Sequence, residues 1–130
     1  MHTRYLEIPR FITLDGSEIR ELMHPAKHGN KTQSLAEATV PPGASTYPHR
    51  HRVSEELYHI TGGHGRMTLG NRRFEVAPGD TVLIPPGTIH CVETIGPEPL
   101  RILCCCSPPY ADADTELLHE AMPRVDFDRQ

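Results

Sequence analysis

Short runs of apolar or alternating residues recur along the middle of the chain, and turn residues separate them every eight to twelve positions. The separators are rich in Pro and Gly, including Pro41-Pro42-Gly43 and the near copy Pro85-Pro86-Gly87. Pro followed by Gly is typical of a type II turn. The pattern predicts an all-β sandwich or barrel. The predicted strands are Ser34–Val40, Glu55–Thr61, Arg66–Leu69, Arg73–Val76, Thr81–Ile84, Ile89–Ile95 and Leu100–Cys106.

The flanks are less regular than this centre. We expect two strands near Arg10–Thr13 and Glu18–Leu22, joined by a turn at Asp15-Gly16 and followed by a polar loop. A short helix is predicted over Asp112–Ala121, because acidic residues precede Leu117, Leu118 and Ala121. The sequence thus predicts one domain in three parts: an N-terminal arm (residues 1–33), a core (34–106) and a C-terminal extension (107–130).

Composition and charge exclude several classes of partner. The chain has 130 residues with 13 Lys and Arg against 17 Asp and Glu, which gives no reason to expect nucleic acid or an anionic membrane. No run is long and apolar enough for a transmembrane helix, and the N-terminus lacks a signal-peptide pattern. We therefore expect a cytoplasmic protein. Cys91, Cys104, Cys105 and Cys106 lack metal or redox spacing and are interpreted as reduced, small apolar residues, one of which could line a pocket.

The candidate chemistry begins with His49 and His51. Residues two apart on a strand share a face, so the two imidazoles project together and form half of a metal site. The next predicted strand supplies a carboxylate, either Glu55 or Glu56. Glu56 shares its face with Tyr58 and Ile60, which is the better interior face, so Glu56 is the preferred ligand and Glu55 the alternative.

The fourth candidate is His90, which follows the Pro85-Pro86-Gly87 turn and shares a face with Val92 and Thr94. It would point into the barrel opposite the first pair. Four ionisable side chains inside a barrel without a metal would carry a severe desolvation cost, which favours metal binding. Imidazole nitrogen and carboxylate oxygen suit one divalent ion of Fe, Mn, Ni, Co or Zn.

These two stretches resemble the two motifs of the cupin superfamily. The first matches at Gly43, His49, His51, Glu56 and Gly63, although counting Glu55 and Gly62 also satisfies it, so the motif leaves the choice of carboxylate open. The second matches at the residues Gly79, Pro85, Gly87 and His90, with Thr94 where Asn is usual. The resemblance covers about residues 34–106. The chain is similar to small cupin-2 proteins.

The resemblance implies a double-stranded β-helix (jelly-roll) barrel with one metal ion per chain, and a homodimer in which the N-terminal arm reaches a neighbour. Similar cupins include dioxygenases, sugar isomerases, decarboxylases and lyases acting on small molecules. We therefore expect a metal-dependent enzyme with a small oxygenated substrate, either a dioxygenase or an isomerase/lyase; Tyr58 is a candidate catalytic acid or base beside the metal. The alternative is a non-catalytic module that binds metal and a small ligand as a sensor or carrier.

Overall fold

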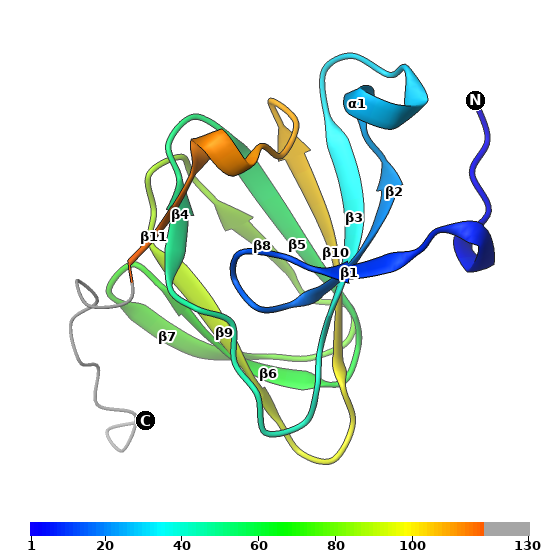
Figure 1. Cartoon of the computed structure of the whole chain (residues 1–130). Coiled ribbons are helices and arrows are strands. Elements are labelled where there is room, and N and C mark those ends of the chain that lie inside the picture. Colours follow the sequence, from blue (N-terminus) through cyan, green and yellow to red (C-terminus); the bar gives the residue numbers. More distant parts are fainter. Residues whose placement is uncertain (119–130) are drawn as a thin grey trace.

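The computed structural model describes residues 1–118 as two antiparallel β-sheets that face each other and curve into a barrel (Figure 1). One sheet has the order β1-β2-β3-β10-β5-β8, and the other has the order β11-β4-β9-β6-β7. The strands are β1 (Arg10–Ile12), β2 (Glu18–Met23), β3 (Ser34–Val40), β4 (His49–His51), β5 (Glu55–Gly62), β6 (His64–Leu69), β7 (Arg72–Val76), β8 (Thr81–Ile84), β9 (His90–Ile95), β10 (Leu100–Ser107) and β11 (Thr115–Leu117). This arrangement confirms the all-β jelly-roll fold.

Alternation along the strands builds the core. On β5 every second residue is buried, starting with Glu56, and β8, β9 and β10 show the same two-residue period. The inward side chains of the two sheets form one hydrophobic cluster, whose largest fully buried members include Ile60, Met67, Leu100 and Ile102. Part of this cluster, including Ala38, Tyr58 and Cys104, also lines the cavity that contains the buried polar residues His49, His51 and Glu56.

The two Pro-Pro-Gly sequences form the predicted turns. Gly43 and Gly87 have φ angles of +77° and +79°, and the backbone N–H groups of Ala44 and Thr88 donate to the carbonyls of Pro41 and Pro85. A positive φ at the second central position is the signature of the type II turn. The second of these turns ends two residues before His90 and so sets the start of β9.

The N-terminal strands extend the first sheet rather than forming a separate layer. β2 pairs with β3, and β1 pairs with β2 at the end of the sheet. Between β2 and β3, where a polar loop was expected, lies the helical turn α1 (Pro25–His28). Pro25 occupies its first turn, the His24 ring accepts from the Ala26 N–H, and Gly29 ends it with a φ of +85°.

The predicted C-terminal helix is wrong where the structure describes it. Asp112–Asp114 forms a single 3-10 turn (η2), and Thr115–Leu117 is the strand β11. Strand β11 pairs with β4, whose edge would otherwise be open at this end of the sheet, so strand pairing outweighs the local helical pattern. The remaining predicted helical residues, 119–121, lie outside the described residues.

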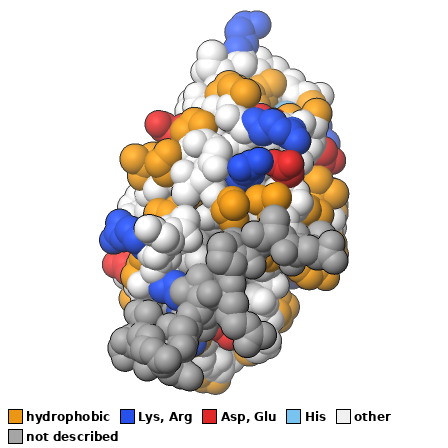
Figure 2. Space-filling view, turned by 90° about the vertical axis from the view of Figure 1, so that its left-hand side faces the viewer, with side chains coloured by type: hydrophobic (Ala, Val, Ile, Leu, Met, Phe, Trp, Pro, Cys, Tyr) orange, Lys and Arg blue, Asp and Glu red, His pale blue; other side chains and the backbone are white. Residues whose placement is uncertain are grey.

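The surface next to β4 and β11 carries mixed charge. Arg50 and Arg52 lie 2.6 and 3.8 Å from the two carboxylate oxygens of Glu116. On the face that Figure 2 shows, basic and acidic side chains lie next to one another, with apolar side chains around them. Among residues 1–118, no helix has the length and apolar character needed to cross a membrane.

Candidate metal centre

Strand pairing brings the three candidate histidines together. In β4 both His49 and His51 are buried while Arg50 between them points outward, as the two-residue period requires. His49 of β4 pairs directly with His90, the first residue of β9. Because directly opposed residues on antiparallel strands present their side chains to the same face, His90 joins the first pair inside the barrel.

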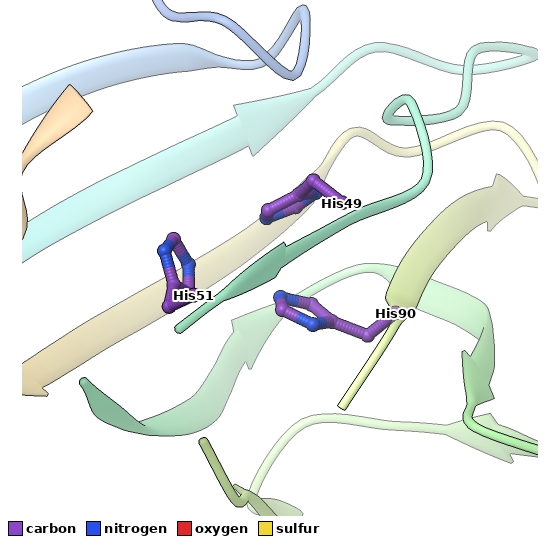
Figure 3. A group of neighbouring side chains, drawn as sticks. All are labelled: His49, His51 and His90. Carbon is purple, nitrogen blue, oxygen red and sulfur yellow. The ribbon is translucent and has the colours of Figure 1, made fainter. Parts of the chain in front are cut away.

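The three imidazoles point toward one another (Figure 3). One ring nitrogen from each of His49, His51 and His90 lies within 4.8 Å of the other two. The ring centroids of His49 and His90 are 4.2 Å apart, and those of His51 and His90 are 5.6 Å apart. This spacing fits three nitrogens that share one ion at the bond lengths of about 2.0–2.1 Å that zinc and its neighbours prefer.

Each ring is held through its other nitrogen. Nδ1 of His49 lies 2.9 Å from the Tyr47 carbonyl, and Nδ1 of His90 lies 2.9 Å from the Thr88 carbonyl. A carbonyl only accepts, so both Nδ1 atoms must carry the hydrogen. Nδ1 of His51 lies 3.0 Å from Oγ1 of Thr115, whose own hydrogen is donated to the carbonyl of Ala111. Each ring therefore turns Nε2 to the interior, where it offers a lone pair whenever the ring is neutral, the arrangement of metal-binding histidines.

Glu56 completes the interior polar group. Its Oε1 lies 3.1 Å from Nε2 of His51 and 3.6 Å from Nε2 of His90. Both Oε1 of Glu56 and Nε2 of His90 are inaccessible to solvent and make no hydrogen bond within residues 1–118. A carboxylate oxygen that faces two lone pairs requires a proton or a cation between them, because buried acceptors otherwise repel. The donor set and these unsatisfied atoms fit a divalent transition metal.

Burial and neighbouring charge shift the pKa values in a direction that suits a metal site. Burial lowers the pKa of His49 to about 4, with a further lowering by His90, so this imidazole is neutral near pH 7. Burial raises the pKa of Glu56, but hydrogen bonds and positive charge from the facing His51 and His90 rings, which need a proton on Nε2 when no cation lies between them, lower it to about 2. A cation in that position would keep the carboxylate ionised in the same way. Neutral imidazoles with an ionised carboxylate are the protonation states that coordinate a cation.

Two further acidic side chains reach the cavity in front of the histidines. The cavity is open to solvent on one side, and Asp15 and Glu21 line it together with Glu56. Asp15 comes from the turn between β1 and β2, and its Oδ2 lies 3.7 Å from Nε2 of His49. The other lining residues are Phe11, Thr13, Ser17, Ile19, Ser34, Ala36, Ala38, His49, His51, Tyr58, Cys104, Cys106, Tyr110 and Thr115.

The structure separates the two candidate carboxylates. Glu56 is buried beside the histidines, whereas Glu55 is exposed on the outer face of β5. Tyr58 is buried, lines the cavity, and its ring centroid lies 5.8 Å from that of His90. Burial beside the charge of Glu56 raises the pKa of Tyr58 well above its usual value, so its hydroxyl keeps its proton. The assignment of ligands and of a catalytic role to Tyr58 stays a prediction.

Several residues of the site carried no signal in the sequence. Thr115 and Asp15 lie 64 and 34 positions from the histidines they adjoin, and only the fold brings them there. Cys106 donates from Sγ to Oε2 of Glu56 at 3.3 Å, and burial raises the pKa of its thiol, so the donor hydrogen is kept. All four cysteines are free, as expected, and Cys104 and Cys106 line the cavity.

Comparison with known proteins gives a consistent result. The family model described as "Cupin domain" matches residues 36–106. An uncharacterized protein of Methanocaldococcus jannaschii is 55% identical over 116 residues, which cover 89% of this chain and 93% of that protein.

Solved structures of similar fold include an oxalate decarboxylase and a predicted oxalate decarboxylase. The enzyme of Bacillus subtilis is 30% identical with a TM-score of 0.75, over 88% of this chain and 31% of that chain, so the present chain spans about a third of it. A predicted oxalate decarboxylase from Thermotoga maritima is 26% identical with a TM-score of 0.72, over 83% of this chain and 99% of that one.

Proposed function

Because the chain belongs to the cupin domain family, we propose that its three-histidine centre holds one divalent transition metal ion and works as an enzyme site for a small oxygenated molecule. The observation that carries this proposal is the cluster of three buried histidine nitrogens beside Glu56, in which Oε1 of Glu56 and Nε2 of His90 are buried without a hydrogen-bond partner among residues 1–118. His49, His51, His90 and Glu56 would be the ligands. Fe, Mn, Ni, Co and Zn all fit this donor set.

The bound ion would act as a Lewis acid on a carbonyl, hydroxyl or carboxyl group, or with iron would support dioxygen chemistry. The protein's own contribution is orientation. The Nδ1 hydrogen bonds of the histidines fix each ring, and Cys106 holds one oxygen of Glu56 so that the other faces the rings. The cavity at the open side provides room for a small molecule, and Tyr58 supplies a protonated hydroxyl there.

Two reaction classes are proposed, dioxygenase and isomerase/lyase. The similarity to oxalate decarboxylases supports a metal-dependent reaction of a small oxygenated substrate, while fold alone does not choose the reaction. The identity of the bound metal decides which screen comes first. Iron calls for oxygen-consumption assays, and manganese, nickel, cobalt or zinc calls for isomerase and lyase assays.

The test is metal content by mass spectrometry on protein purified without a histidine tag. We expect about one transition metal ion per chain in the wild type and a loss of that metal in His51→Ala. His59→Ala is the matched control, because His59 is an exposed histidine on the outer face of β5 and bonds only to Thr81 among the contacts described. A wild-type protein that binds no metal after reconstitution would refute the proposal.

A further inference from the structure

Asp15 is held in the cavity by an anchored carboxyl group. Its Oδ1 accepts three hydrogen bonds, from Oγ1 of Thr13 at 2.7 Å and from the backbone N and Oγ of Ser17 at 2.9 and 2.6 Å. Ser17 is only 2% exposed, so this cluster is part of the packed structure. One oxygen of Asp15 is therefore saturated, and the orientation of the other is fixed.

The turn that carries Asp15 is tied to the strand that carries His49. The backbone N–H of Tyr47 donates to the Asp15 carbonyl at 2.8 Å, and Tyr47 precedes His49 by two residues. The Tyr47 ring also packs over Gly16, which has a φ of +88°; a β-carbon at Gly16 would lie 3.6 Å from that ring. The position of Asp15 relative to the metal centre is thus set by direct contacts.

The free oxygen of Asp15 lacks a donor. The hydrogen bonds that Asp15 accepts within residues 1–118 all go to Oδ1, and Oδ2 lies 3.7 Å from Nε2 of His49. That nitrogen presents a lone pair, because Nδ1 of the same ring carries the hydrogen. An acceptor that faces a metal-ligating lone pair is placed to receive a hydrogen bond from a hydroxyl group bound at the metal.

Charge gives a second, independent constraint. Three carboxyl groups line the cavity, those of Asp15, Glu21 and Glu56. With a divalent cation on neutral imidazoles, the formal charge of the site is +2 − 3 = −1. A site of net negative charge disfavours an anionic ligand relative to a neutral one.

We propose that Asp15 is a specificity-determining residue that accepts a hydrogen bond from a hydroxyl group of a neutral, hydroxylated carbonyl substrate and repels anionic ones. The inference rests on the proposed metal centre and narrows its substrate class. It distinguishes this chain from enzymes named for oxalate, a small dianion, although such proteins share its fold.

The experiment compares two probes on cobalt-loaded protein, followed by calorimetry and by the cobalt absorption band. Dihydroxyacetone is the neutral hydroxylated carbonyl probe, and oxalate is the anionic probe. In Asp15→Asn we expect dihydroxyacetone to bind about tenfold more weakly and oxalate about tenfold more tightly, from the loss of one charged acceptor and one nearby charge. Glu18→Gln is the control, because it removes a carboxylate of the same hairpin that pairs with Arg10 at the surface.

The two changes of opposite sign separate specificity from structural damage. Weakening of both probes, or no change in either, would overturn the inference while a full cobalt complement leaves the metal proposal standing. A wild-type protein that holds cobalt but binds oxalate more tightly than dihydroxyacetone would also overturn it. A protein that holds no cobalt would refute the proposed function itself, and metal analysis reports that outcome separately.

Discussion

Thr115→Val tests whether the hydrogen bond behind His51 prepares the metal centre. Valine keeps the shape of threonine but removes the oxygen that accepts from Nδ1 of His51 at 3.0 Å. His51 is 3% exposed, so its Nδ1–H would be left buried without a partner. Leaving such a donor unsatisfied costs about 1–3 kcal/mol of unfolding free energy. For a chain of this size that loss lowers the melting temperature by roughly 3–6 °C per kcal/mol.

The same hydrogen bond between His51 and Thr115 also gives the expected change in metal affinity. Removing the hydrogen-bond partner of a ligating histidine typically weakens metal binding by about 10–100-fold, which corresponds to about 1.4–2.8 kcal/mol. The ring can then rotate, and the wrong nitrogen can carry the hydrogen. We expect Thr115→Val to retain the fold and to bind zinc 10–100-fold more weakly than the wild type.

The assay is a competition titration against a chromophoric zinc chelator, with urea unfolding of the metal-free proteins measured in parallel. Thr115→Ser is the matched control, because serine retains the hydroxyl that accepts from His51 and donates to the Ala111 carbonyl. We expect the serine variant to stay within about threefold of wild-type affinity. A valine variant with wild-type zinc affinity would refute the assigned ring orientation and with it the argument that Nε2 faces the ion.

Two further predictions concern acid stability and assembly. In the metal-free protein the pKa of His49 is lowered to about 4, whereas in the unfolded chain it is about 6.5. As the pH is lowered from about 6.5 to 4, the unfolded state therefore binds more protons than the folded state, and the free energy of unfolding falls. Urea midpoints across this range check it, and a His49→Gln variant should lose that part of the slope. The homodimer stays a prediction, and we expect it to pair through β1, an end strand with Phe11 and Ile12 exposed. Light scattering should give twice the chain mass for the wild type and the mass of a single chain for Ile12→Lys. A monomeric wild type would contradict the predicted dimer.

Much of the fold follows from local signals in the sequence. Two strands, Ser34–Val40 and Thr81–Ile84, have the bounds that their alternation predicts, because one face of each packs into the interior. The interior positions of His49, His51 and Glu56 follow from the same two-residue period. These features depend on near neighbours along the chain, which is why periodicity finds them.

The parts that the sequence does not predict depend on contacts between distant segments. The helical pattern at Asp112–Ala121 is overridden at Thr115–Leu117 because β4 offers an edge to pair with. From the sequence, Asp15 is an ordinary turn residue. It lines the cavity only because β2 pairs with β3, which places the β1–β2 hairpin beside it. By contrast, α1 could have been found, since Pro25 and Gly29 mark a helical start and end.

The partnership between His51 and Thr115 has a consequence for the growing polypeptide. The two residues are 64 positions apart, so at about 5–20 residues per second roughly 3–13 s of translation separates them. During that interval the histidine pair exists without the strand that orients its second ring. If the centre holds a metal as proposed, the nascent chain would offer only an incomplete site, and full metal binding would wait until β11 has been added to the sheet.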